Sequence, residues 1–296
     1  MSDIEAGVAS FELAQAADGA AGADPNSRHG IEPRSAVDLG TAIHASSIVH
    51  PSAVVGRGSE IGPFCIVGEH VRIGERTKLL ANVVVNGHTT IGDECTIYPF
   101  CSIGMASQDR KYGGERAFTT IGNRTVIREY CSIHRATGED EVTSVGDDCL
   151  LLAYTHVAHN CRIGNGVTMS NLAQRAGHVD VHDHANIGGI AAAHQFVRIG
   201  KHAMVGGATK LTRDLPPFFL AEGNPAQVYG LNSVGLRRAQ FSPATVAELK
   251  ECYKIMYRSG RNLSQALATL KEFVQTDEGK LLVAFIEAPS ERGILK

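Results

Sequence analysis

Residues 61–97 read IGPFCIVGEHVRIGERTKLLANVVVNGHTTIGDECTI, and every sixth residue from Ile61 to Ile97 is Ile, Val or Leu. The same register extends from Ile43 to Leu211, where 24 of the 29 positions hold Val, Ile, Leu or Met. A six-residue period fits neither an α-helix nor an alternating strand. It predicts a parallel β-helix, in which each hexapeptide forms one flat side of a coil. The residues four places after the aliphatic ones are almost always small or β-branched: Ser47, Ala53, Ser59, Cys65, Thr77, Val83, Thr89, Cys95 and Cys101.

Three hexapeptides complete one turn of about 18 residues, so the repeat is long enough for roughly nine turns. The predicted fold class is therefore mainly β, with the β-helix over residues 41–215 and an α-helical C-terminal domain over 216–296. A prism of this kind has flat outer faces, and we expect it to assemble as a homotrimer about a shared axis.

Charged residues interrupt the aliphatic register at Asp109, Glu115 and Glu139. Because a carboxylate is costly to bury without a partner, these positions should leave the coil. The sequence predicts loops at 104–120 and 134–144. Loops on a rigid scaffold are where binding residues concentrate.

The two ends of the chain lack the repeat. Residues 1–40 hold seven acidic and two basic side chains with no sustained period, and we expect a disordered extension there. After Leu211 the register ends, and 218–240 is predicted to be irregular. Ser242 followed by Pro243 suits a helix start, and apolar spacing predicts helices over 242–258, about 263–275 and about 278–288.

Composition excludes several classes of protein. A net charge of −3 does not suggest a nucleic-acid binder, and no apolar stretch is long enough to span a membrane. The acidic N-terminus is not a secretory signal, so we expect a cytoplasmic location. Six of the seven cysteines fall on the small inward position of the repeat, which indicates packing rather than metal or redox chemistry: Cys65, Cys95, Cys101, Cys131, Cys149 and Cys161. We expect no cofactor and no metal.

Five histidines lie outside both inward positions: His134, His156, His159, His178 and His194. Counted in 18-residue turns, His159, His178 and His194 lie on the same side of three consecutive turns, and His156 is at the corner just before them. All five are predicted to point outward or lie at corners. His182 and His184 resemble metal ligands in spacing, but the register places them on the next side.

An imidazole suits general-base catalysis because its unperturbed pKa is about 6.5. The chain has no Gly-x-Ser-x-Gly elbow, and its cysteines are predicted to be buried. A direct transfer, in which one histidine activates an acceptor hydroxyl, is therefore simpler than an acyl-enzyme. The amide of Gly177, just before His178, could hold a developing oxyanion.

Several motifs resemble those of the acyl-carrier-protein-dependent UDP-N-acetylglucosamine O-acyltransferases, which begin lipid A synthesis in Gram-negative bacteria. The resemblance covers about 43–296 and implies a left-handed coil. The motifs are NGH at 86–88, QDRKY at 108–112, IHR at 133–135, HVAHNC at 156–161, AGH at 176–178, AHQF at 193–196, EGNP at 222–225, GLN at 230–232 and YRSG at 257–260.

The resemblance implies specific roles. His159 matches the general base, which would take the proton from the glucosamine 3-hydroxyl, and Gly177 matches the oxyanion donor. Gly207 matches the position that limits acyl-chain length, Lys111 a loop lysine near the substrate, and His194 a histidine needed for full activity. Residues matched to substrate binding or positioning are Asp109, His134, His156, His178, Gln195, Asn232 and Arg238. The implied partners are acyl carrier protein and UDP-N-acetylglucosamine.

Three positions depart from the pattern. Asn160 stands where relatives often carry Asp, Val234 where they can carry a carboxylate, and Ala239 where they have a second basic residue. These departures leave open whether the acceptor carries a 3-hydroxyl or a 3-amine, so a UDP-amino-sugar N-acyltransferase is one alternative. A second is a trimeric zinc-dependent enzyme resembling carbonic anhydrase, with His178, His182 and His194 as ligands. A non-catalytic scaffold would need neither the loops nor the histidine column.

Overall fold

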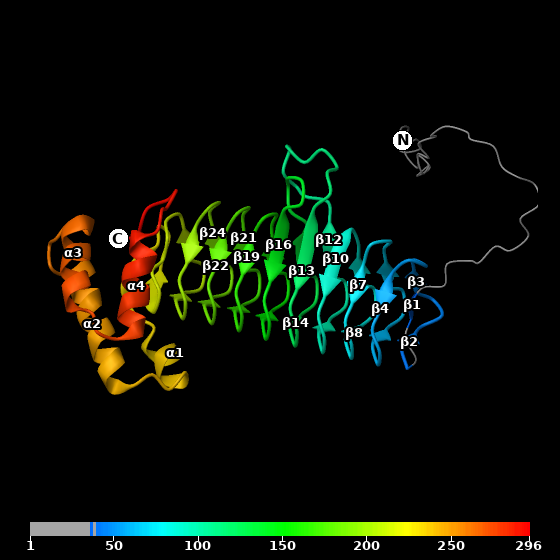
Figure 1. Cartoon of the computed structure of the whole chain (residues 1–296), viewed down its shortest axis with the longest axis horizontal. Helices are drawn as coiled ribbons and strands as arrows, with labels where there is room; N and C mark the ends of the chain where they lie inside the picture. Colours follow the sequence, from blue (N-terminus) through cyan, green and yellow to red (C-terminus); the bar gives the residue numbers. More distant parts are fainter. Residues whose placement is uncertain (1–35, 38–39) are drawn as a thin grey trace, which may run out of the picture. The chain divides into compact units, whose positions relative to one another are not determined.

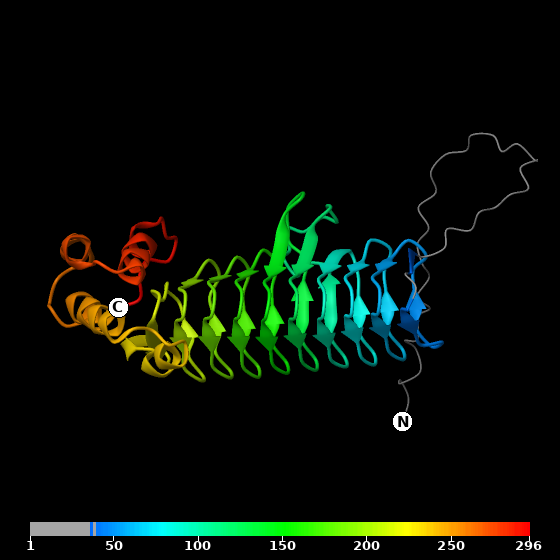
Figure 2. The same cartoon turned by 60° about the horizontal axis from the view of Figure 1, so that its bottom comes forward.

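The computed structural model describes residues 36–37 and 40–296. The chain winds into a left-handed parallel β-helix whose turns stack along one axis, with helices at its C-terminal end (Figures 1 and 2). The predicted fold class is confirmed. The predicted disorder of the N-terminal extension falls mainly on residues outside the described ones.

The coil has three sides, which we name A, B and C in chain order. Side A contains β1 (Ala36–Val37), β4 (Val54–Val55), β7 (Arg72–Ile73), β10 (His88–Ile91), β13 (Phe118–Ile121), β16 (Val142–Val145), β19 (Arg162–Ile163), β22 (Asp180–Val181) and β25 (Arg198–Ile199). Side B contains β2 (Ala42–Ile43), β5 (Glu60–Ile61), β8 (Lys78–Leu79), β11 (Thr96–Ile97), β14 (Val126–Ile127), β17 (Leu150–Leu151), β20 (Thr168–Met169), β23 (Asn186–Ile187) and β26 (Met204–Val205). Side C contains β3 (Ile48–Val49), β6 (Ile66–Val67), β9 (Val84–Val85), β12 (Ser102–Met105), β15 (Ser132–His134), β18 (His156–Val157), β21 (Gln174–Arg175), β24 (Ala192–Ala193) and β27 (Lys210–Leu211).

The hexapeptide positions behave as predicted. The aliphatic residues from Val55 to Leu211 point into the coil and are almost fully buried, and all seven cysteines are buried and free. The small inward residues also satisfy the corners. Thr77 Oγ1, for example, donates to the carbonyl of Gly92 at 2.7 Å and accepts the amide of Cys95 at 3.0 Å. The Cys95 thiol in turn donates to Gly122 O, so it acts as a polar partner as well as a small apolar group.

Arg175 is an exception inside the coil. It occupies an aliphatic register position on β21 and is 1% exposed. Its Nη1 donates to the carbonyls of Gln174 and Ala191, but Nε and Nη2 have no partner among the described residues. Burial lowers the pKa of this guanidinium to about 10.

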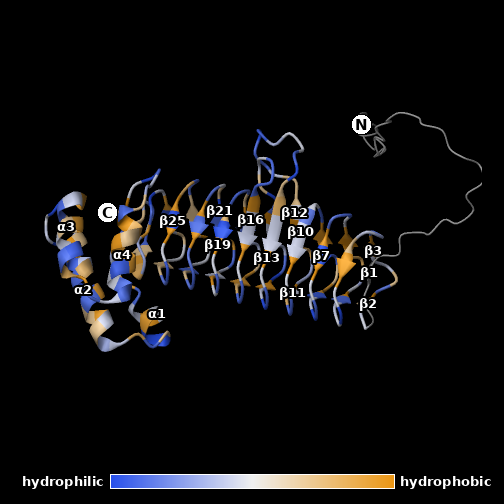
Figure 3. Cartoon of the chain, in the orientation of Figure 1, coloured by the Kyte–Doolittle hydropathy of each residue, from blue (hydrophilic) through white to orange (hydrophobic). Residues whose placement is uncertain are grey.

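Both predicted loops leave the coil, and both are shorter than predicted. β12 continues to Met105 and β13 begins at Phe118, so the first loop is 106–117; the second is 135–141. Figure 3 shows the first loop coloured mainly hydrophilic above the coil. Glu115 and Glu139 lie in these loops, as the interrupted register predicted.

The structure corrects two predictions about the ends of the coil. β1 pairs in parallel with β4, so the coil begins by Ala36 rather than at 41; Val37 stands six residues before Ile43, in register. The prediction that 218–240 is irregular was wrong. β28 (Phe219–Glu222) adds to side B beside β26 and forms an antiparallel pair with β29 (Gln227–Leu231), and α1 spans Ser233–Arg238. Asn232 caps α1 by accepting the amide of Gly235.

The remaining helices agree with prediction: α2 (Pro243–Tyr257), α3 (Leu263–Phe273) and α4 (Asp277–Glu287). Ser242 caps α2 as expected. No helix among the described residues is long and apolar enough to cross a membrane.

The outer surfaces of the three sides differ. Outward residues of side A include the charged Arg72, Arg162, Asp180 and Arg198, whereas the central strands of the other sides carry uncharged ones. On side B these are Thr96, Val126, Leu150, Thr168, Asn186 and Met204, and on side C Val84, Ser102, Ser132, His156, Gln174 and Ala192. The B–C corner carries exposed apolar side chains, which we call the apolar column: Phe64, Phe100, Tyr130, Tyr154, Leu172 and Ile190.

Candidate active site

The loops and the histidine column meet at one edge of the coil, the C–A corner. Loop 106–117 joins β12 on side C to β13 on side A, and loop 135–141 joins β15 to β16 across the same corner. The turns at His159–Asn160, Gly177–His178 and Gln195–Phe196 are the same corner in three later turns. The structure therefore brings the loops beside the column that the register predicted.

The imidazole of His159 is held in one orientation by its neighbour. Its Nδ1 lies 2.9 Å from Asn160 Oδ1. The Asn160 amide cannot be flipped, because Oδ1 also accepts the Thr137 amide at 3.0 Å while Nδ2 donates to the Thr137 carbonyl at 3.1 Å. Since Oδ1 can only accept, Nδ1 must carry the proton. Nε2 is then left with a free lone pair, which is the protonation state that a general base requires.

The two loops continue this chain of contacts away from His159. Ser107 Oγ lies 2.7 Å from Thr137 Oγ1 and accepts the amide of Asp109 at 3.1 Å. The carboxylate of Glu115 accepts the amides of Gly138 and Gly113, each at 2.7 Å. These hydrogen bonds, above all the one from Gly138, hold the pKa of Glu115 below its usual value. The orientation of His159 is thus connected to the loop that carries Asp109 and Lys111.

Gly177 lies directly against the His159 ring. A Cβ at this position would overlap the Cε1 and Nε2 atoms of His159, so only glycine leaves room for the imidazole. The Gly177 amide makes no hydrogen bond within the described part of the chain. A buried and unused N–H beside the basic nitrogen is suited to a developing oxyanion.

Two other histidines border this corner on side C. The rings of His134 and His156 meet edge to face with centroids 5.1 Å apart, and Ser132 Oγ lies 2.8 Å from His156 Nδ1. Burial, helped by the neighbouring histidines, lowers the pKa of His134 to about 4; burial also lowers that of His156. The buried Nδ1 of His134 has no hydrogen-bond partner among the described residues.

None of the five histidines faces the interior of the coil. His134 and His159 are nevertheless each only 8% exposed. The ring of His156 packs against His134, and the ring of His178 and the main chain of Gly177 pack against His159.

His178 is exposed and lies edge to face against His159, with centroids 5.3 Å apart, and it stacks on Phe196. Burial and the nearby His159 lower its pKa, while Asp109 acts in the opposite direction. The Asp109 carboxylate accepts the amide of Lys111 at 3.0 Å, which forms a tight turn at the exposed end of the loop.

His194 and Gln195 lie at the C–A corner one turn after Gly177 and His178. Both contact the C-terminal tail. Arg292 Nη2 lies 2.6 Å from His194 Nδ1, and Arg292 Nε donates to the Gln195 carbonyl at 2.7 Å. Sequence reasoning missed Arg292. It belongs to no repeat, and it is separated from His194 by 98 residues.

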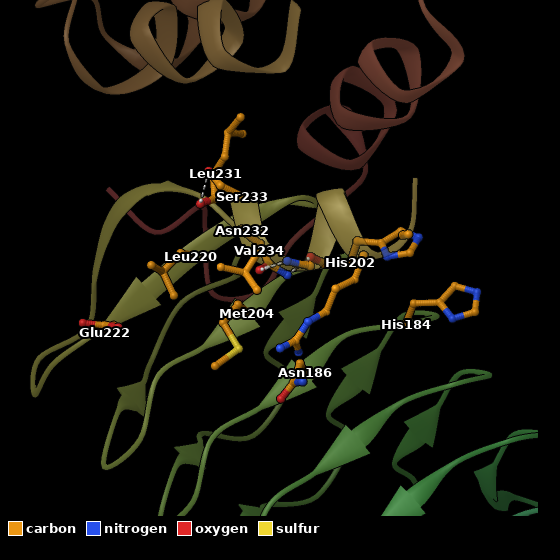
Figure 4. Close-up of a pocket in the computed structure, with 13 residues that line it drawn as sticks. His184, Asn186, His202, Met204, Leu220, Glu222, Leu231, Asn232, Ser233 and Val234 are labelled. Carbon is orange, nitrogen blue, oxygen red and sulfur yellow. Dashed lines mark hydrogen bonds between the residues drawn. The ribbon is translucent and has the colours of Figure 1, made fainter. Parts of the chain in front are cut away.

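Asn232 and Arg238 lie elsewhere, in a pocket of about 760 Å³ between α1 and side B (Figure 4). His184 and His202 stack at its edge, with centroids 4.8 Å apart, and Asn186 and Met204 project from the strands. Val234 and Ala239, two of the departures, also line this pocket. Gly207 is at the B–C corner, where an added Cβ would approach only the Gly189 carbonyl, at 3.5 Å.

The candidate residues thus form two groups. In a three-sided prism the C–A corner is opposite side B, so one chain cannot bring Arg238 to His159. The zinc set is not assembled in one chain either. His182 packs on Phe285 and lies near Asp180, while His178 stacks on Phe196 and His194 contacts Arg292. No group of three metal-ligating side chains occurs among the described residues.

Solved structures with this fold are similar along most of the chain. LpxA from Acinetobacter baumannii is 42% identical, covers 86% of this chain and 99% of its own, and superposes with a TM-score of 0.82. The UDP-N-acetylglucosamine acyltransferase from Campylobacter jejuni is 33% identical, covers 86% and 98%, and has a TM-score of 0.81.

The fold and the corner site define a hexapeptide-repeat transferase. Residues 70–104 match the family model of bacterial transferase hexapeptides (six repeats), and residues 214–295 match domain 2 of UDP N-acetylglucosamine O-acyltransferase. The acyl-[acyl-carrier-protein]–UDP-N-acetylglucosamine O-acyltransferase of Burkholderia orbicola is 45% identical over 212 residues, 70% of this chain and 80% of that protein. The chain belongs to this family of O-acyltransferases.

Proposed function

We propose that this chain transfers an acyl group from acyl carrier protein to the 3-hydroxyl of UDP-N-acetylglucosamine, the first step of lipid A biosynthesis. The family assignment supports the substrates. The observation that carries the mechanism is the pairing of two groups at the C–A corner. The Nε2 lone pair of His159 lies beside the unused amide of Gly177.

In the proposed reaction the sugar hydroxyl attacks the thioester carbonyl while His159 Nε2 accepts its proton. The Gly177 amide donates to the carbonyl oxygen as it gains negative charge. Collapse of the tetrahedral intermediate breaks the C–S bond, and the proton passes from His159 to the leaving thiolate. The products are the 3-O-acyl sugar nucleotide and the free carrier thiol. No covalent enzyme intermediate is required, and every cysteine of the chain is buried.

We propose that a homotrimer completes the site. The central strands of sides B and C have uncharged outward residues, and the two sides meet at the apolar column. Pairing side B of one subunit with side C of the next buries both faces and puts the apolar column toward the axis. That arrangement sets the Arg238 pocket of one subunit opposite the histidines of its neighbour. Side A, with its arginines, stays outside.

In this arrangement Asn232 and Arg238 bind the anionic part of the nucleotide, and His134, His156, His178, Gln195, Asp109 and Lys111 position the sugar. The open space at Gly207 admits a long acyl chain. Val234 replaces a carboxylate that relatives can carry in this pocket, and Ala239 replaces a second basic residue. The nucleotide is therefore held mainly through Arg238. The buried free thiols fit a reducing cytoplasm.

The direct test is transfer by the purified protein from a mixed pool of acyl and 3-hydroxyacyl carrier proteins to UDP-N-acetylglucosamine, with the product identified by mass. Replacing His159 with Ala should reduce kcat by about 10²–10⁴. Turnover close to normal in that variant would refute the base assignment. Preference for a 3-amino sugar nucleotide would replace the O-acyltransferase with the N-acyltransferase.

A further inference from the structure

The C-terminal tail, residues 288–296, is anchored to the end of the coil. Asp214 donates its amide to Gly293 O at 2.9 Å and accepts the amide of Leu295 at 2.8 Å, so the tail lies alongside it as a short parallel bridge. Ile294 and Leu295 are buried, and the Tyr257 hydroxyl donates to the Leu295 carbonyl at 3.0 Å. Figures 1 and 2 show the tail, in red, at the same edge of the coil as loop 106–117.

A turn in this tail presents Arg292 to the C–A corner. Ser290 Oγ accepts the amides of Arg292 at 3.2 Å and Gly293 at 2.7 Å, and Gly293 adopts a φ of 68°, which glycine tolerates without strain. The Arg292 guanidinium then reaches two groups of one corner turn, the Gln195 carbonyl and His194 Nδ1. Two donors of one planar group fix its position better than one would.

The contact determines where the proton of His194 lies. A guanidinium has only donors, and Arg292 Nη2 at 2.6 Å is much closer to His194 Nδ1 than the Gln195 carbonyl oxygen at 3.4 Å. Nδ1 of His194 therefore accepts, and the ring proton of the neutral imidazole is on Nε2. His194 is exposed, so this N–H is available to a ligand at the corner. The two histidines thus differ at Nε2. Asn160 leaves a free lone pair on Nε2 of His159, whereas Arg292 leaves a free N–H on Nε2 of His194.

We propose that Arg292 is a positioning residue of the active site, which holds His194 with Nε2–H as a hydrogen-bond donor to an oxygen of the bound substrate. This proposal rests on the proposed function. It assigns the tail a part in substrate binding as well as in folding. Nothing in the repeat or in the histidine column requires the tail to approach this corner.

A double-mutant cycle tests whether Arg292 acts through His194. Arg292→Met removes the donors and keeps the apolar stem, and it should lower kcat/KM by roughly 10- to 100-fold, the loss expected for a charge-assisted hydrogen bond. In a His194→Ala background the same change should cost less than about 2-fold. Arg292→Lys keeps the charge but has a single nitrogen in place of Nε and Nη2, so it should recover only part of the loss.

Arg261→Met is the matched control, since Arg261 is exposed and its side chain has no hydrogen bond or ion pair among the described residues; its kcat/KM should not change. An equal loss from Arg292→Met in both backgrounds, or wild-type activity in Arg292→Lys, would overturn the proposal. So would a fall in Tm large enough to account for the lost activity.

A second measurement separates this proposal from the proposed function. Long-range ¹H–¹⁵N spectra of histidine-labelled protein, assigned with His194→Ala, should show a hydrogen-bonded acceptor Nδ1 and a protonated Nε2 for His194. Arg292→Met should abolish the hydrogen-bond shift of Nδ1. This result is expected whether or not the protein transfers acyl groups, and an unchanged His194 spectrum would refute the contact itself.

Discussion

Asn160 holds the proposed general base in place. It orients His159 through an amide that the main chain of Thr137 locks from both sides. Unlike a carboxylate, a neutral amide adds no charge to stabilise an imidazolium at His159.

Replacing Asn160 with Asp should change kcat/KM by less than about 10-fold in either direction. A carboxylate would stabilise the imidazolium that forms as His159 accepts a proton, and loss of the Nδ2 contact to Thr137 O opposes that gain. Initial rates over a range of sugar-nucleotide concentrations provide the test, and Gln265→Glu at the start of α3, outside the coil, is the control. A loss far above 10-fold would show that orienting His159 depends on the Nδ2 contact to Thr137 O as well as on the contact to Nδ1.

Arg175 is the least favourable residue of the core. Its guanidinium is buried, and two of its nitrogens have no partner in the part of the chain that the structure describes. Burying such a group usually costs more free energy than burying an apolar side chain of similar size. Replacing Arg175 with Leu restores the register and should stabilise the protein by about 1–3 kcal/mol. Thermal unfolding, with Met169→Leu as a volume-conserving control, measures the effect. A lower Tm than wild type would show that the guanidinium has a partner that stabilises it.

At the scale of elements, the two loops act as one unit. Glu115 joins them by accepting main-chain amides from both, and the lowered pKa of its carboxyl means that these bonds stabilise the loops at ordinary pH and are lost as the pH falls below about 4.5. Because Thr137 belongs to the second loop and holds Asn160, disorder in the loops should reach His159.

Replacing Glu115 with Gln should therefore lower kcat as well as raise the KM for the sugar nucleotide, by roughly 3- to 30-fold in kcat/KM. Glu272→Gln on α3, whose side chain makes no contact of this kind among the described residues, is the control. If KM alone rose, the loops would bind substrate without orienting His159.

The sequence predicted the elements that the repeat controls. The six-residue period predicted the coil, and Asp109, Glu115 and Glu139 marked the two loops because a carboxylate cannot occupy a core position. It could not predict α1, a six-residue helix whose main local signal is the Asn232 cap. Nor could it predict that His134 and His159 are nearly buried, or that Arg292 reaches His194, because the tail that carries Arg292 lies outside the repeat.

For the whole molecule, the uncharged central strands of sides B and C predict where subunits meet. Replacing Leu150 with Glu puts a charge on the outer face of side B and should convert the proposed trimer to monomers. Activity should be lost, because Arg238 would no longer face the histidines of a neighbour. Light scattering after size exclusion measures the mass. Arg72→Glu on side A should remain trimeric and active, and a trimeric Leu150→Glu variant would show that side B is not an interface.

The buried cysteines have a consequence for how the coil comes apart. Each turn of a stacked coil is stabilised mainly by the turns on either side of it. Unfolding should therefore begin at an end of the coil and proceed turn by turn. Free thiols are distributed along the axis from Cys65 to Cys161, each inaccessible until its own turn opens. Pulsed alkylation with mass spectrometry should therefore modify Cys65 before Cys101 and Cys131. The order in which the thiols are alkylated would thus show which turns of the coil open first.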